Sequence, residues 1–205
     1  MRSFTAPLAL ILTLLGSATL RAQEVWAGPV FVHTGYADLD RAVGLEGRLG
    51  LPWLGLEVGA AWARDGSSRI GDPCAGLVLP GTQRCAPQEL DIAGTMTTLS
   101  LDRPIPVLRR NVGLFAIPLF GVAFLDTRRR GTVSDAQLIG DRTAVRLGLA
   151  AELRGRFGGD GPMGYSARLY GGSLFSANSA CADCFEPFRD GAFEARLSAG
   201  LWYRW

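Results

Sequence analysis

Apolar and polar residues alternate over two long stretches of this chain. From Phe193 to Trp205 the odd positions carry Phe, Ala, Leu, Tyr and Trp, while the even positions carry Glu, Arg, Ser and Gly, with Trp202 the one large apolar exception. The stretch Thr143–Phe157 repeats this order, with leucines on one face and mainly arginine, glycine and glutamate on the other. Because side chains of a strand point alternately to its two faces, both stretches predict β-strands with one apolar and one polar face.

Both stretches exceed the length of globular strands, which is about five or six residues, and suit the roughly 9–11 residues of a tilted strand that crosses a bilayer. No stretch after Ala22 shows apolar residues at helical spacing with caps. The whole chain is predicted to form eight strands: Val25–Gly35, Ala42–Leu51, Leu54–Arg64, Asp91–Asp102, Val112–Asp126, Arg142–Phe157, Met163–Phe175 and Ala192–Trp205.

The connections between these strands alternate in length. Short connections follow the second, fourth and sixth strands: Pro52-Trp53, Arg103–Asn111 and Gly158–Pro162. Long, polar connections follow the third, fifth and seventh: Asp65–Leu90, Thr127–Asp141 and Ser176–Gly191, whereas the first, Tyr36–Arg41, is modest. Short turns at one end and long loops at the other are typical of an outer-membrane barrel with both termini in the periplasm. Pro29 and Pro118 interrupt the first and fifth strands and predict a bulge or a local change of register there.

The first 22 residues have the order of a secretory signal peptide: a basic start, a short apolar run over Ala6–Leu15 and small residues before Gln23. The apolar run is too short for a membrane-spanning helix, so we expect cleavage after Ala22 and one mature domain over residues 23–205. Cleavage removes two of the 21 basic residues and none of the 19 acidic ones. The mature chain is then neutral, which argues against a nucleic-acid partner.

Four cysteines in an exported chain predict disulfides. Three pairings are possible, and the sequence-local pairs Cys74–Cys85 and Cys181–Cys184 are the simplest. The Cys181–Cys184 spacing also occurs in redox and metal motifs, but one such motif with a single histidine in the chain is a weak signal. We therefore expect no metal site and no cofactor.

Charged residues fall on the face of the strands that a closed barrel turns toward its lumen. They are Glu46, Arg48, Glu57, Asp102, Arg146, Glu152, Arg154, Arg168, Glu194 and Arg196. Charges in a narrow lumen need partners of opposite sign, so these residues are expected to form interior ion pairs. A two-residue turn at Pro52-Trp53 places Leu51 opposite Leu54 and predicts contact between Arg48 and Glu57. In a soluble sandwich the same charges would be solvated and contribute little to stability.

Aromatic residues gather at the two ends of the predicted strands, as in the girdles of a barrel at the bilayer interfaces. The periplasmic set is Trp26, Trp53, Phe157, Tyr165, Tyr203 and Trp205, and the outer set is Phe31, Trp62, Phe124, Phe175 and Phe193. Core packing explains any one of them taken alone, whereas their joint placement favours the girdles.

Residues 23–205 resemble a small eight-stranded outer-membrane β-barrel of the OmpA-like or OmpX-like type. The chain end carries the resemblance, because Leu197, Ala199, Leu201, Tyr203 and Trp205 are similar to the aromatic C-terminal strand that the barrel-assembly machinery reads, in which Phe is commoner than Trp at the last position. The resemblance implies an all-β, antiparallel up-and-down transmembrane barrel in the outer membrane of a Gram-negative bacterium. It implies no single activity, since such barrels serve as anchors, adhesins and enzymes.

Eight strands leave a lumen that side chains fill, which argues against an open pore. The favoured function is therefore a monomeric, non-enzymatic barrel that contacts outer-membrane lipid, lipopolysaccharide or surface partners through its loops. Arg128, Arg129 and Arg130 begin the third outer loop and are candidates for phosphate contact, although a solvated charge run is the simpler interpretation.

Two alternatives remain. The first is an enzyme on lipid A or phospholipid, which requires a loop serine or acid within hydrogen-bonding reach of His33. The second is a soluble exported barrel that binds a small ligand and would be found in the periplasmic wash.

Overall fold

The computed structural model describes residues 24–36, 39–71, 88–108, 112–131, 137–158, 161–176 and 192–205. The strands are β1 (Glu24–Thr34), β2 (Ala42–Leu51), β3 (Leu56–Gly71), β4 (Gln88–Asp102), β5 (Ile105–Leu108), β6 (Val112–Gly131), β7 (Gln137–Arg156), β8 (Met163–Ser176) and β9 (Ala192–Arg204). Within these ranges, no helix is long and apolar enough to cross a membrane.

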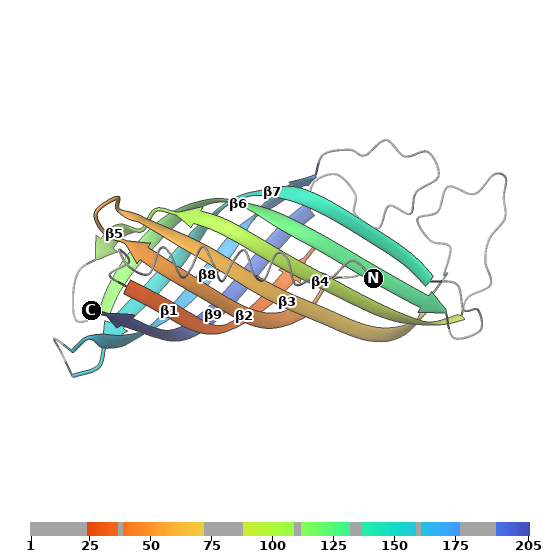
Figure 1. Cartoon of the computed structure of the whole chain (residues 1–205), viewed down its shortest axis with the longest axis horizontal. Coiled ribbons are helices and arrows are strands. Elements are labelled where there is room, and N and C mark those ends of the chain that lie inside the picture. Colours follow the sequence, from red (N-terminus) through yellow and green to blue (C-terminus); the bar gives the residue numbers. More distant parts are fainter. Residues whose placement is uncertain are drawn as a thin grey trace.

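The strands form one closed antiparallel sheet in which neighbours in the chain are neighbours in space (Figure 1). The first and last long strands pair with each other, β1 with β9, and β4 pairs with β6. The short β5 continues β4 along the same side of β6, so the two share one of eight positions around the barrel. The predicted fold, an all-β, eight-stranded, up-and-down barrel, is confirmed.

Several strands extend beyond their predicted ends. β3 runs on to Gly71 and β4 begins at Gln88, while β6 runs on to Gly131 and β7 begins at Gln137. The predicted connections Asp65–Leu90 and Thr127–Asp141 are therefore partly wrong, because their outer parts are strand. Hydrophobic alternation ends where the apolar band ends, whereas the backbone ladder continues for as long as the two strands stay paired.

The predicted register of the β2–β3 hairpin is wrong. Leu51 pairs with Leu56 and not with Leu54. The turn covers four residues, Pro52 to Gly55, with Leu54 N donating to Leu51 O at 2.9 Å. Gly55 has a φ of 64°, a left-handed conformation that glycine adopts at little cost and that lengthens the turn.

Pro29 causes no bulge in the β1–β2 pair, and Pro118 causes none in the β6–β7 pair. Pro29 pairs with Leu45 and Pro118 with Leu149 in unbroken registers. Each proline lies where pairing with its other neighbour is interrupted, β9 for Pro29 and the junction of β4 and β5 for Pro118. The absent proline N–H therefore falls at a gap in the ladder.

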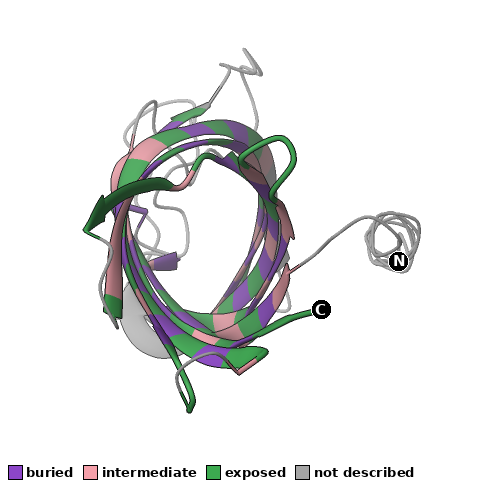
Figure 2. Ribbon diagram, turned by 90° about the vertical axis from the view of Figure 1, so that its left-hand side faces the viewer, coloured by how far each residue is buried: buried purple, intermediate pink, exposed green. Residues whose placement is uncertain are grey.

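Exposed and buried residues alternate along the strands around the whole barrel (Figure 2). Leu149 and Leu197 are 60% and 53% exposed on the outer face, whereas Arg146 and Glu152 are each 1% exposed inside. The barrel is thus the inverse of a soluble domain, with apolar side chains outside and ionised ones inside.

The loop-side half of the lumen is apolar. Its side chains form a buried cluster of Val30, Val32, Tyr36, Leu39, Ala42, Ala61, Ala63, Met96, Ala123, Leu125, Ala144 and Leu174. Tyr36 and Leu39 come from the β1–β2 connection, where Thr34 Oγ1 donates to Leu39 O at 2.9 Å and Leu39 N donates to Tyr36 O at 3.0 Å. These bonds fold the connection inward, so that it caps the cluster.

Candidate functional site

The other half of the lumen holds a network of ion pairs centred on Glu152 of β7. Arg48 Nη1 lies 2.9 Å from Glu152 Oε1, and Arg168 Nη2 lies 2.7 Å from Glu152 Oε2. Arg154 Nη2 donates to the same Oε2 at 2.9 Å. Arg48 comes from β2, on the opposite side of the barrel from β7, so this one carboxylate links both walls.

Glu57 of β3 is the second carboxylate of the network. It accepts hydrogen bonds from Arg154 Nη2 and, at 2.7 Å, from Arg168 Nη2. The structure brings Arg48 Nη1 to 3.7 Å from Glu57 Oε2. Arg48 and Glu57 are thus neighbours although the hairpin register differs from the predicted one, because a long arginine side chain spans the offset.

The remaining members complete the network at its edges. Arg168 Nη1 donates to Asp102 Oδ2 at 2.5 Å, and Arg48 Nε lies 3.3 Å from Glu46 Oε1. Glu24, the first residue of β1, accepts from Arg154 Nη1 at 3.3 Å. Glu24 lies just outside the predicted first strand, which is why the alternation did not include it among the interior charges.

Trp26 lies inside the barrel and not in the periplasmic aromatic girdle on its lipid-facing side, so the prediction for this residue is wrong. Its ring is stacked on Arg48, with Cζ 3.8 Å from the ring centroid, and the side chain is 4% exposed. Gly200 of β9 faces the indole, and a Cβ at that position would approach Trp26 Cζ2 to 2.7 Å. A glycine on the adjacent strand therefore makes the room for an inward tryptophan.

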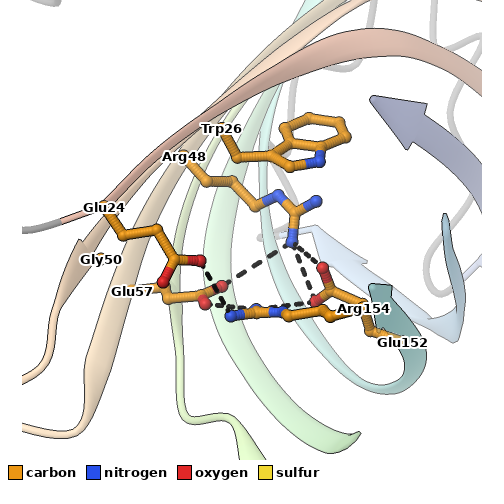
Figure 3. Close-up of a pocket in the computed structure, with 7 residues that line it drawn as sticks. All are labelled: Glu24, Trp26, Arg48, Gly50, Glu57, Glu152 and Arg154. Carbon is orange, nitrogen blue, oxygen red and sulfur yellow. Dashed lines mark hydrogen bonds and ion pairs between the residues drawn. The ribbon is translucent and has the colours of Figure 1, made fainter. Parts of the chain in front are cut away.

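The side chains at the mouth of this half line a small pocket, which Figure 3 shows with the ion pairs that cross it. Its lining is Glu24, Trp26, Arg48, Gly50, Glu57, Glu152 and Arg154. Acidic and basic side chains alternate across the pocket and are bound to one another. The arrangement is suited to holding strands together and to blocking the lumen.

A second ionic group lies nearer the apolar cluster. Arg146 Nε donates to Glu194 Oε2 at 2.8 Å, and Arg196 Nη2 donates to Glu194 Oε1 at 2.7 Å. Arg196 Nη1 also donates to Thr98 Oγ1 on the opposite wall at 3.1 Å. Tyr170 packs its ring against Arg146, with Cζ 4.9 Å from the centroid. We call the two ionic groups together the lumen charge cluster.

His33 is the only histidine of the chain, and it lies at the loop end of β1. Its Nδ1 is 2.8 Å from Asp40 Oδ1, and both side chains are about half exposed. An acid therefore does lie within hydrogen-bonding reach of His33, as the enzyme alternative requires. Within the described part of the chain, no serine hydroxyl is bonded to that imidazole, and no group of His, Cys, Asp and Glu residues could hold a metal ion.

Several predicted site residues lie elsewhere. Arg128, Arg129 and Arg130 belong to strand β6 and do not begin a loop; Arg128 is exposed, with Nε 3.5 Å from Asp126 Oδ1. Cys74, Cys85, Cys181 and Cys184 and the signal segment 1–22 lie outside the described residues.

The proposed assembly residues alternate outward along the last strand. Leu197, Ala199, Leu201 and Tyr203 are exposed on β9, and Trp205 follows that strand. The rings of Tyr203 and Trp205 are 6.0 Å apart. All the aromatic residues assigned to the two ends, except Trp26, are exposed: Phe31, Trp53, Trp62, Phe124, Phe157, Tyr165, Phe175, Phe193, Tyr203 and Trp205.

The strand order and the inverted distribution of side chains define a small, closed, up-and-down β-barrel with an apolar outer face. Similar solved structures are the N-terminal β-barrel domain of OprF from Pseudomonas aeruginosa, at 14% identity over 89% of this chain and 98% of that chain (TM-score 0.51), and a major outer membrane protein from Thermus thermophilus, at 14% identity over 89% and 99% (TM-score 0.52). Neisserial surface protein A is similar at 13% identity over 89% and 96% (TM-score 0.50). No protein-family model and no curated protein matches this sequence. The resemblance to small eight-stranded barrels is confirmed for the fold.

The network makes a direct prediction for Glu152. Replacing it in Glu152→Gln leaves two buried arginines, Arg48 and Arg168, and the partly buried Arg154 short of a negative partner, and we expect a loss of about 3–5 kcal/mol in the free energy of unfolding. Urea unfolding of the protein folded into vesicles measures this loss. The matched control is Arg41→Gln, because Arg41 is 80% exposed and its Nε lies 3.9 Å from Asp40 Oδ2; we expect a change within about 0.5 kcal/mol. Equal effects of the two substitutions would show that the network contributes little.

Proposed function

We propose that this protein is an integral β-barrel of the bacterial outer membrane with a structural or surface-interaction role. The supporting observation is the outer face of the barrel, which exposes large apolar side chains on every long strand, Leu45, Leu149, Leu169 and Leu197 among them. A soluble monomer rarely exposes contiguous apolar surface of this extent. A closed barrel satisfies its backbone hydrogen bonds internally, which is the condition for a sheet to span lipid.

The lumen supports a closed barrel and not a pore. The lumen charge cluster crosses it in one half, and the apolar cluster capped by Tyr36 and Leu39 fills it in the other. An ion that crosses the lumen in either direction would have to displace paired arginines in one half and lose its hydration among apolar side chains in the other, both at high free-energy cost.

The exported form of the chain is part of this proposal. A signal segment over residues 1–22 would be removed, and the aromatic face of β9 would be read by the barrel-assembly machinery. The solved barrels with the same fold include one that is described as a major outer membrane protein and one described as a surface protein. The mature protein would act as a monomer, since pairing of β1 with β9 leaves no open edge between the first and last strands.

Membrane insertion predicts heat-dependent migration on a gel. The protein from the membrane fraction, solubilised in detergent, should run differently before and after boiling, because a closed barrel resists the detergent until it is heated. Recovery in the periplasmic wash, with a single mobility at both temperatures, would favour the soluble ligand-binding barrel.

The arginines at the loop end of β6 predict contact with the phosphates of lipopolysaccharide. The triple substitution of Arg128, Arg129 and Arg130 by glutamine should lower the amount of lipopolysaccharide that copurifies with the folded protein by about tenfold to a hundredfold, since three lost charged contacts at about 0.5–1 kcal/mol each sum to about 1.5–3 kcal/mol. Arg204→Gln, at the other end of the barrel, is the control and should change nothing. Equal amounts of lipopolysaccharide with both variants would show that the three arginines are solvated and do not bind it.

The absence of catalysis is tested at His33. If the pair with Asp40 fixes the β1–β2 connection and performs no chemistry, His33→Ala leaves the acyl composition of lipid A and phospholipid unchanged in cells that produce the protein. Mass spectrometry of extracted lipids makes the comparison with the parent chain and with cells lacking it. A chain-dependent change in acylation that His33→Ala abolishes would establish the enzyme alternative.

A further inference from the structure

Among the described strands, the short β5 is the only one that pairs with a single neighbour. It lies at the end of the barrel where the last strand finishes (Figure 1). Arg103 and Pro104 separate it from β4, and it pairs with β6 only. β3 begins at Leu56, and the register of β3 with β4 ends at the pair of Glu57 with Asp102. The side of β5 away from β6 is therefore an open strand edge.

This open edge carries no backbone donor up to the register shift that follows Pro106. Arg103 N donates to Pro118 O at 3.2 Å, so in an antiparallel ladder residues 103 and 105 turn their backbone groups toward β6. Residues 104 and 106 then turn theirs toward the open edge, and both are proline, which has no N–H. The carbonyls of these prolines can accept hydrogen bonds, but a second strand would receive none from this part of the edge, which disfavours a ladder there.

The side chains of β5 are nevertheless apolar and exposed. Ile105, Val107 and Leu108 are 47%, 62% and 45% exposed. Ile105 pairs with Ala116 and Leu108 with Leu114, which lie on the outer face of β6, so these side chains extend the apolar face of the barrel to its rim. The missing donors at Pro104 and Pro106 disfavour a strand as the partner, and continuity with the outer face indicates lipid.

Arginine lies beside this apolar segment. Arg103 is exposed on the same outer face, and Arg109 and Arg110 follow Leu108 in the sequence, outside the described residues. An arginine side chain can keep its aliphatic part against apolar surface while its guanidinium reaches a phosphate. Apolar residues with adjacent positive charge favour the interface of a bilayer that contains anionic lipid.

We propose that β5 is a lipid-binding segment at the periplasmic rim, where Ile105, Val107 and Leu108 insert among acyl chains and Arg103 selects anionic phospholipid headgroups of the inner leaflet. The inference rests on the proposed membrane location, and it adds a lipid preference at one place on the rim. Lipid binding by β5 requires no conformational change of the barrel.

Photo-crosslinking tests this proposal. The full chain carries a benzophenone amino acid at position 107 and is folded into vesicles of equal parts phosphatidylcholine and phosphatidylglycerol. A second form carries it at position 149, where Leu149 is 60% exposed in the middle of the apolar outer face. Illumination joins the benzophenone carbon to a nearby C–H carbon, and intact-mass measurement identifies what has been attached. Only samples that migrate as folded barrels are compared.

We expect lipid adducts at both positions, with the ratio of phosphatidylglycerol to phosphatidylcholine about two- to fivefold higher at position 107 than at position 149. Arg103→Gln should bring the ratio at position 107 down to that at position 149. Lipid adducts at position 149 alone, or adducts to a second copy of the chain at position 107, overturn the inference and leave the membrane location intact. Lipid adducts at both positions with equal ratios overturn the headgroup preference. No lipid adduct at either position contradicts the membrane location itself.

Discussion

The requirement that every ionised group in the lumen has a partner governs this barrel. Glu152 meets three arginines, and those arginines reach carboxylates on strands across the barrel. The links from Arg48 to Glu152 and from Arg168 to Glu57 join residues about a hundred positions apart in the sequence, because opposite walls face one another only after the sheet has closed. These ion pairs therefore connect opposite walls of the barrel, whereas the backbone hydrogen bonds connect only adjacent strands. Removing one partner leaves the other charge buried and unpaired in a low dielectric. The resulting loss of folding free energy is larger than the net contribution of the pair.

The lumen has an ionic half and an apolar half, and side chains fill both. In one half arginines and carboxylates neutralise each other around Glu57 and Glu152, and in the other Met96, Leu125 and Leu174 exclude water. The inward β1–β2 connection seals the second half with Tyr36 and Leu39. Side chains thus fill the described lumen in two chemically different ways, by charge neutralisation in one half and by apolar packing in the other.

Alternation along the chain predicts which face each strand residue occupies, and the structure agrees for Leu149, Arg146 and Glu152. It does not predict which charges meet, because that depends on strand tilt and on register summed around the whole sheet. Gly55 lengthens one turn and shifts the β2–β3 register, and β5 arises within a stretch that looked like a plain turn. Trp26 lies two residues after Glu24 and therefore points to the same, inner face of β1. A tryptophan near a strand end is also typical of an aromatic girdle, so the sequence alone favoured the outer face. The space beside Gly200, which admits the indole into the lumen, becomes visible only in the structure.

The ionic cross-links also bear on how the barrel forms. Arg48 of β2 pairs with Glu152 of β7, and Glu24 of β1 pairs with Arg154 of the same strand, so both pairs join residues about a hundred or more positions apart in the chain. In an unclosed sheet these two pairs could not form, so they stabilise only the closed barrel, whereas Arg168 and Glu152 already meet across the β7–β8 pair. Partly assembled forms therefore gain nothing from these two cross-barrel pairs, which form only when the pairing of β1 with β9 closes the sheet. The cross-barrel pairs therefore favour the closed barrel over partly closed intermediates.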